Sequence, residues 1–281
     1  MTVEELKLKA NDIREDIIRM LEEAGSGHSA GPLGLADIFS ALYFDILKHD
    51  PKKPDWPERD ILLLSNGHCV PVLYAAMAEA GYFKKEELLS LRKYGSRLQG
   101  HPERLKLPGL EATSGPLGSG LSQACGMALA MRMDNIKQRW IYVVTGDGEL
   151  NEGNVWEAMM LASKYKLTNI IAIVDRNNIQ IDGPTETVMP LEDLRKKWES
   201  FGWFVLEING NEVEEVIEAT KLAKAIENRP VVIIAHNVPG KGVDFMEYDF
   251  HWHGIPPDDA QAKIALKELR TLKGKIESES D

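Results

Sequence analysis

The second half of the chain alternates short apolar runs with longer segments of helical pattern. The four runs rich in Val and Ile are WIYVVT (140–145), NIIAIVD (169–175), WFVLEI (203–208) and PVVIIAH (230–236). Helical patterns separate them at 153–164, 191–200 and 212–227. Continuous apolar runs are typical of strands buried on both faces, and alternation with helices is typical of parallel sheets. We therefore predict an α/β fold with a doubly wound, mostly parallel sheet flanked by helices.

The first half adds one strand and several helices to this prediction. ILLLS (61–65) reads as a buried strand, and helical patterns occupy 3–24, 35–47, 69–81, 85–94 and 121–133. The segment GSGHSAGPLG (25–34) should break the first helix. Two irregular stretches, 95–120 and 237–258, are long enough to suggest functional loops. A last helix follows, and we expect the tail GKIESESD to be frayed.

Composition limits the classes of protein to consider. The 281 residues are 43% hydrophobic, which allows one large domain over 1–281. The mean hydropathy of -0.26, without a long apolar run, predicts no membrane segment. The net charge of -11 argues against nucleic-acid binding. The charged N-terminus lacks the apolar core of a signal peptide, and Cys69 and Cys125 read as reduced core thiols, so we expect a cytoplasmic location.

Two polar motifs follow neighbouring runs of the predicted sheet. Asp147, in Gly-Asp-Gly, comes after run 140–145, and Asn177, in Asn-Asn, comes after run 169–175. Parallel strands linked by one helix bring both side chains to the same edge, where such sheets bind ligands. One carboxylate and one amide cannot fill the oxygen shell of a hard cation, which suggests that a bound diphosphate completes it. The alternative is that both residues only build turns.

The motifs taken together resemble the transketolase family of thiamine diphosphate enzymes. The matching segments, in family order, are GSGHSAGPLG, LLLSNGHCVPVLYA, GHPE, LPGLEATSGPLGSGLSQACGMALA, GDGELNEGNVWEA, DRNNIQIDG and HWHG. The resemblance implies the thiamine diphosphate-binding fold of the diphosphate-binding domain. It covers nearly the whole chain, whereas complete transketolases add a pyrimidine-binding and a C-terminal domain. We expect those two domains on a separate chain.

The resemblance also implies roles for particular residues. Asp147, Asn177 and the backbone carbonyl of Ile179 would bind Mg²⁺, with Ca²⁺ or Mn²⁺ as alternatives. Cofactor contacts would come from His68, Gly115, Leu117, Gly146, Gly148, Asn177 and His253. Glycines at these positions would let the backbone approach the phosphates. Gly115 and Leu117 could instead belong to a plain helix N-terminus.

Four histidines fall on family motifs, and three do not. The resemblance implies that His28, His101 and His253 face the substrate, and neutral imidazoles suit proton exchange with substrate oxygens. Among the rest, His49 should be solvated, His251 has the wrong register for the motif, and His236 stays ambiguous.

Glu152 and Glu157 lie in GDGELNEGNVWEA. The resemblance makes them candidates for a carboxylate cluster at the subunit interface, linked to activation of the partner's cofactor. The alternative is two solvated acids in the first turns of a helix.

The activity that the resemblance implies is transfer of a two-carbon ketol unit from a ketose phosphate to an aldose phosphate, as in pentose phosphate metabolism. This chain would act as the N-terminal subunit, with a C-terminal transketolase subunit in a heterotetramer of two copies of each. The alternatives are a subunit of another thiamine diphosphate enzyme and a non-catalytic assembly subunit that retains the fold.

Overall fold

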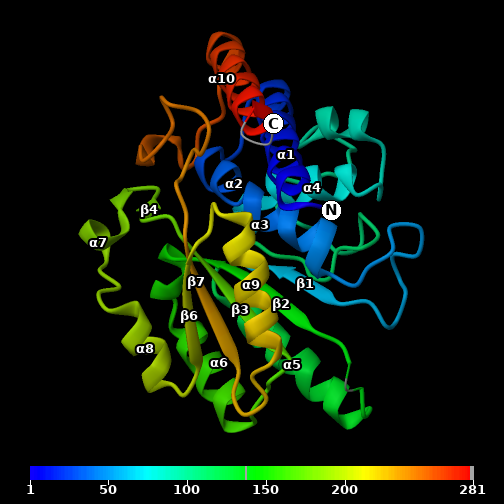
Figure 1. Cartoon of the computed structure of the whole chain (residues 1–281), viewed down its shortest axis with the longest axis vertical. Coiled ribbons are helices and arrows are strands. Elements are labelled where there is room, and N and C mark those ends of the chain that lie inside the picture. Colours follow the sequence, from blue (N-terminus) through cyan, green and yellow to red (C-terminus); the bar gives the residue numbers. More distant parts are fainter. Residues whose placement is uncertain (137, 279–281) are drawn as a thin grey trace.

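A five-stranded parallel sheet forms the centre of the fold, as predicted (Figure 1). The computed structural model describes residues 1–136 and 138–278. The strands, in spatial order, are β1 (Ile61–Leu64), β2 (Ile141–Gly146), β3 (Ile170–Arg176), β7 (Val231–His236) and β6 (Phe204–Asn209). Each lies within two residues of its predicted run, because Val/Ile-rich runs bounded by polar turns define strand ends clearly.

Helices cover both faces of the sheet. On one face lie α5 (Ser119–Met133), α6 (Gly153–Lys164) and α8 (Leu194–Ser200). On the other lie α1 (Val3–Ala24), α3 (Ala36–Ala41), α4 (Val70–Glu79) and α9 (Val213–Lys224). Successive side chains of a strand point to opposite faces, so Val143 packs with the first group and Val144 with the second. Both faces of the central strands β2, β3 and β7 are therefore buried, which explains why these strands are apolar without alternation.

The order of the strands in the sheet determines where a ligand can bind. After β3 the chain moves to the far edge at β6 and returns to β7, which pairs with β3. Helix α9 makes this return on the opposite face from α5 and α6. Parallel sheets bind ligands beyond the carboxyl ends of their strands, and the carboxyl ends of β2 and β3 lie side by side here.

Several helices differ from their predicted bounds. Helix α2 (Ala30–Gly34) begins inside the segment that should have been a break, and the predicted helix 35–47 is α3 followed by a π-helical turn, Leu42–Ile46. The predicted helix 85–94 is a 3₁₀ helix, Lys85–Ser90. Helix α8 begins at Leu194 rather than 191, because the Asp193 side chain caps it by accepting from the Lys196 amide.

The C-terminal helix is longer than predicted. Helix α10 spans Asp259–Ser278 and lies alongside α1 at the top of Figure 1. Buried Leu269 and an ion pair from Lys273 to Asp12, 3.0 Å long, attach it to the body of the fold. The expectation of a frayed tail is therefore wrong for 274–278, while 279–281 lie outside the described residues.

Short elements complete the fold. They are the 3₁₀ turns Gly67–Cys69, Gly148–Asn151 and Phe250–Trp252, the paired strands β4 (Ile179–Gln180) and β5 (Gly183–Pro184), and α7 (Thr185–Val188). Cys69 and Cys125 are buried free thiols, as predicted. Among residues 1–136 and 138–278, no helix combines the length and the apolar character needed to cross a bilayer.

Candidate active site

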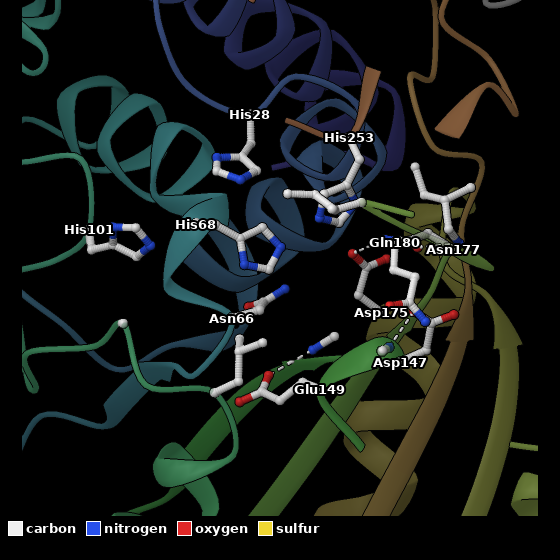
Figure 2. Close-up of a pocket in the computed structure, with 16 residues that line it drawn as sticks. His28, Asn66, His68, His101, Asp147, Glu149, Asp175, Asn177, Gln180 and His253 are labelled. Carbon is white, nitrogen blue, oxygen red and sulfur yellow. Dashed lines mark hydrogen bonds between the residues drawn. The ribbon is translucent and has the colours of Figure 1, made fainter. Parts of the chain in front are cut away.

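A cavity of about 370 Å³ lies at the carboxyl edge of the sheet (Figure 2). Its walls include every residue predicted to bind the metal or the cofactor, namely His68, Gly115, Leu117, Gly146, Asp147, Gly148, Asn177, Ile179 and His253. His28 and His101, which were predicted to face the substrate, line it as well. Glu152 and Glu157 do not. One cavity thus collects motifs from both halves of the sequence.

Asp147 and Asn177 lie at the ends of neighbouring strands, as the motif spacing predicted. Gly146 of β2 pairs with Asp175 of β3, and the Asp147 amide donates to the Asp175 carbonyl over 3.2 Å. The chain then continues from both strands into the cavity wall, where Figure 2 shows the two side chains near each other. Strand register therefore sets the relative position of the two strand ends on this wall.

Asp147 is 1% exposed, and both oxygens of its carboxylate accept hydrogen bonds from the protein. Its Oδ1 accepts from the Gly148 amide over 2.7 Å, and its Oδ2 accepts from the Asn178 amide over 2.8 Å. Asn178 has a φ of 62°, so it is the turn residue that aims this amide. Burial raises the pKa of Asp147, and the positive charge of Arg176 lowers it.

Asp175 is a site residue that sequence reasoning missed. Its side chain is fully buried, and it accepts from the Asn177 amide nitrogen over 2.8 Å and from that of Asn237 over 2.5 Å. Burial raises its pKa to about 7. By holding the nitrogen end of the Asn177 amide, Asp175 assigns the oxygen end to other partners, among them the Ile179 amide at 3.1 Å. Its position in Asp-Arg-Asn-Asn, at the end of a buried strand, was the available signal.

The opposite wall is a cluster of imidazole rings. The centroid of His28 lies 4.9 Å from that of His68 and 5.7 Å from that of His253, and His68 and His253 are 5.1 Å apart. His101 stands further along the same wall, beside Gly115 (Figure 2). The four rings come from four separate segments, so tertiary folding alone brings them together.

Their environment keeps these imidazoles neutral at neutral pH. Burial, with the charges of His253, His101 and Arg92, lowers the pKa of His28 from 6.5 to about 4. Burial also lowers the pKa of His253, and it lowers that of His68 well below the ordinary value. For His101 the causes of the lowered pKa are burial and the nearby charge of Arg92. Neutral rings can each donate one hydrogen bond and accept another.

Glu149 joins the two glycine motifs and was also missed. Its buried carboxylate accepts from the Ser65 hydroxyl, from the Gly118 amide over 2.6 Å and from the Gly146 amide over 3.0 Å. Burial raises its pKa, and these hydrogen bonds lower it. The residue therefore ties the Gly-Pro-Leu-Gly loop to the Gly-Asp-Gly turn, so both motifs keep a fixed spacing across the cavity.

Two features of the walls fit a diphosphate cofactor. A Cβ added at Gly115, Gly146 or Gly148 would meet no protein atom closer than 3.5 Å, so packing within the chain does not require glycine there. The absent side chains instead leave the backbone open to the cavity. At Gly118, by contrast, a Cβ would collide with Asn154, which is a structural reason for glycine.

Unpartnered polar atoms are the second feature. Within the described part of the chain, no hydrogen-bond partner exists for Nδ1 of His28, Nδ1 of His253, Nε2 of Gln180 or either amide atom of Asn66. All four residues line the cavity. Buried polar groups without partners are costly, so this clustering fits a site built for a polar ligand. Asn66 and Gln180 are further residues that sequence reasoning did not single out.

Glu152 and Glu157 lie outside the cavity. Glu152 is the N-cap residue of α6, Glu157 follows one turn later, and both side chains are exposed. They do not line the cavity that would bind the cofactor, so a direct catalytic contact within this chain is not supported. Their proposed place in an interface cluster stays a prediction.

The remaining histidines are outside the site. His49 was expected to be solvated, but its Nδ1 lies 3.0 Å from the Tyr82 hydroxyl and its Nε2 lies 2.7 Å from the Tyr43 carbonyl. Polar sequence neighbours gave no sign of these contacts. His236 bonds Glu207 on the exposed end of β7, and His251 bonds Asp249.

Comparisons with known proteins agree with this geometry. Residues 6–273 match the family described as transketolase, thiamine diphosphate binding domain. An apulose-4-phosphate transketolase subunit of Phocaeicola vulgatus is 40% identical over 281 residues, which cover 100% of this chain and 99% of that protein. The 6-deoxy-6-sulfo-D-fructose transketolase subunit of a Clostridium species is 41% identical over 94% of this chain and 96% of its own length.

One-chain transketolases match over only part of their length. Human transketolase is 38% identical over 94% of this chain, but this covers 42% of the human protein. The crystal structure of Campylobacter jejuni transketolase superposes with a TM-score of 0.86 and 33% identity, over 99% of this chain and 48% of that chain. The chain thus spans less than half of the one-chain enzymes and nearly all of the proteins named as subunits.

Proposed function

The chain belongs to the transketolase family, of which it carries the thiamine diphosphate-binding domain, and we propose that it is the N-terminal subunit of a two-chain, Mg²⁺-dependent transketolase. The observation that carries the proposal is the single cavity that holds all predicted metal and cofactor residues together with His28, His101 and His253. A chance collection of turn residues would not converge on one cavity from both halves of the chain.

In this proposal the sheet edge holds the metal and the diphosphate. Asp147, the Asn177 amide oxygen and the Ile179 carbonyl bind Mg²⁺, while the open backbone at Gly115, Gly146 and Gly148 receives the phosphates. Within the described residues, no group of three or more His, Cys, Asp or Glu side chains could hold a metal ion. Besides these three protein ligands, the cation would be bound by phosphate oxygens of the cofactor and by water, which are usual ligands of Mg²⁺.

The histidines serve the substrate side of the cavity. His68 and His253 contact the diphosphate, and His28, His101 and His253 donate hydrogen bonds to substrate oxygens. Their lowered pKa values keep them neutral at neutral pH, so a ring can donate one proton and accept another without a charge penalty. The thiamine group, when bound, supplies the carbanion chemistry that moves a two-carbon ketol unit.

The donor is a ketose phosphate and the acceptor is an aldose phosphate, as in pentose phosphate metabolism. Two relatives are named for different sugars, one for apulose 4-phosphate and another for 6-deoxy-6-sulfofructose. Assays with several ketoses are therefore needed to identify the donor of this chain.

We further propose that a second chain completes the enzyme. Two relatives of nearly the same length are themselves named as transketolase subunits, which supports a separate partner. That partner would carry the pyrimidine-binding and C-terminal domains, residues 1–281 would form one domain, and two copies of each chain would assemble in the cytoplasm. The exposed Glu152 and Glu157 would then face the assembled interface.

The test is ketol transfer by the purified chain with and without its candidate C-terminal partner. Donors should include xylulose 5-phosphate, apulose 4-phosphate and 6-deoxy-6-sulfofructose, with ribose 5-phosphate among the aldose acceptors. We expect activity only with both chains, thiamine diphosphate and Mg²⁺. Robust activity from this chain alone would refute the two-chain proposal, and inactivity with a verified partner across all donors would support a non-catalytic role.

A further inference from the structure

Arg176 is a buried cation next to the carboxylate that we assign to the metal. It is the last residue of β3 and is 8% exposed. One guanidinium nitrogen, Nη1, donates to Oδ2 of Asp147 over 3.0 Å, and the other, Nη2, donates to Oε1 of Glu186. Asp147 lines the cavity and Arg176 does not, so the guanidinium contacts the carboxylate without forming part of the wall.

The two oxygens of Asp147 are used unequally. Oδ2 accepts from Arg176, from the Asn178 amide and, over 3.3 Å, from the Thr185 hydroxyl. Among residues 1–136 and 138–278, the one group that donates to Oδ1 is the Gly148 amide. A carboxylate offers about four lone-pair positions in all. Oδ2 is therefore saturated, and Oδ1 is the oxygen with room for a cation.

The charges around this oxygen do not favour a cation alone. The Arg176 guanidinium offsets part of the negative charge of Asp147, while it also pairs with Glu186, and the other assigned metal ligands, the Asn177 amide and the Ile179 carbonyl, are neutral. Asp175 and Glu149 also line the cavity as carboxylates, but both oxygens of each accept hydrogen bonds from protein groups. A divalent cation that arrived by itself would find the charge of its one carboxylate ligand partly offset by a fixed positive charge a few ångströms away.

A diphosphate meets the opposite situation. Without Arg176, the buried Asp147 would be an unbalanced negative charge on the wall that the phosphates approach. With Arg176 in place this repulsion is offset, and the phosphates then bring the negative charge that the cation requires. The Arg176 guanidinium thus weakens binding of the cation and strengthens binding of the diphosphate.

We propose that Arg176 is a charge-balancing residue that disfavours the cation alone and favours the diphosphate, so that the site loads its metal together with the diphosphate. This inference rests on the proposed function, because it takes Asp147 as a metal ligand. Arg176 contacts neither ligand, and it acts through Asp147 as a positioning residue.

The test compares the full-length wild-type chain with Arg176→Met. Mn²⁺ alone, followed by electron paramagnetic resonance of the free ion, reports cation affinity, and inorganic pyrophosphate alone, followed by calorimetry, reports anion affinity. We expect Arg176→Met to bind Mn²⁺ about tenfold tighter and pyrophosphate about tenfold weaker than the wild type. Mn²⁺ alone should also raise the melting temperature of the variant more than that of the wild type, since the ion replaces the lost counter-charge.

Two further variants separate this effect from a loss of structure. Glu186→Gln, at a half-exposed position, leaves the Arg176 charge less compensated, so it should weaken Mn²⁺ and tighten pyrophosphate. Arg14→Met removes another buried arginine–aspartate pair, Arg14 with Asp37, which lies outside the cavity. It should lower the melting temperature without any rescue by Mn²⁺. If Arg176→Met does not fold, the Glu186→Gln measurement carries the test.

The outcomes also separate this inference from the proposed function. If both ligands bind more weakly to Arg176→Met, or if neither affinity changes in Arg176→Met or in Glu186→Gln, the charge-balancing role is wrong. The proposed function would survive that result as long as the wild type binds thiamine diphosphate with Mg²⁺. A wild type that binds neither Mn²⁺ with pyrophosphate nor Mg²⁺ with thiamine diphosphate would refute the site itself.

Discussion

The two walls of the cavity differ in how far the protein itself completes them. On the sheet wall, the carboxylates of Asp147 and Asp175 accept hydrogen bonds on all four oxygens. On the histidine wall, Nδ1 of His28 and Nδ1 of His253 have no partner among the described residues. The sheet wall is thus organised before a ligand arrives, whereas the histidine wall has bonding capacity left for one.

The origin of the residues explains this difference. Asp147 and Asp175 continue paired strands, so the parallel ladder positions them with backbone hydrogen bonds. The four rings of the other wall come from turns and irregular loops that meet only in the folded chain. We therefore expect substitutions on the sheet wall to act on binding, and those on the histidine wall to act on turnover.

The largest effect should come from Asp147→Asn. The substitution keeps the shape of the side chain and removes the only charge among the assigned metal ligands, so Mg²⁺-dependent binding of thiamine diphosphate should be lost. Calorimetry with the cofactor, with and without Mg²⁺, measures this. Unchanged affinity in the presence of Mg²⁺ would remove Asp147 from the metal site.

The next largest effect concerns the opposite wall. His101→Ala and His253→Ala should lower the turnover of the assembled enzyme by ~10²–10⁴, the usual loss for one positioned proton donor or acceptor. His101 lies in an irregular, exposed loop, so its replacement should leave the free energy of unfolding almost unchanged. Steady-state kinetics with the partner chain, together with urea unfolding, separates the two quantities. Wild-type turnover in both variants would contradict the assignment of this wall to the substrate.

A smaller effect should appear in the pH dependence of stability. The pKa of His28 is about 4 in the fold and about 6.5 in the unfolded chain, so above pH 6.5 both states carry it neutral. Between these values only the unfolded chain binds the proton, and stability falls as the pH falls. In His28→Asn, the free energy of unfolding should therefore fall by up to about 3 kcal/mol less between pH 6.5 and pH 4 than in the wild type. Urea unfolding at pH 7.5, 6.0 and 4.5 tests this prediction. If the free energy of unfolding falls with pH as steeply in the variant as in the wild type, the fold does not lower the pKa of His28.

The sequence predicted the sheet wall better than the histidine wall, because paired strands position the first and only tertiary folding assembles the second. Strand runs and the motifs directly after them are local features, so Asp147 and Asn177 could be placed from spacing and parallel topology alone. No local pattern predicts that His28 and His253 meet, and only the family resemblance assigned them to one site. Glu149 and Asp175 were missed because a buried carboxylate at a strand end looks, in sequence, like an ordinary turn acid.

Helix boundaries failed where local geometry departs from a regular α-helix. The apolar pattern of 35–47 continues through a π-helical turn, Leu42–Ile46, since burial and not hydrogen-bond spacing sets the pattern. The tail was expected to fray because it is a chain terminus. However, Lys273, directly before the tail, pairs with Asp12 of α1, a contact that the sequence separation hides.

The smallest effects should come from Glu152→Gln and Glu157→Gln, which belong to neither wall. Both side chains are exposed at the start of α6, so each change should alter the unfolding free energy of the isolated chain by less than about 0.5 kcal/mol. Cofactor affinity of the isolated chain should also stay within error, since neither residue lines the cavity. If the two acids belong to an interface cluster, turnover of the assembled enzyme should nevertheless fall. Measuring turnover at several partner concentrations distinguishes a catalytic loss, which persists at saturation, from weaker assembly, which disappears there. Wild-type turnover and wild-type assembly in both variants would show that they are solvated helix acids, and the functional residues of this chain would then all lie on the two walls.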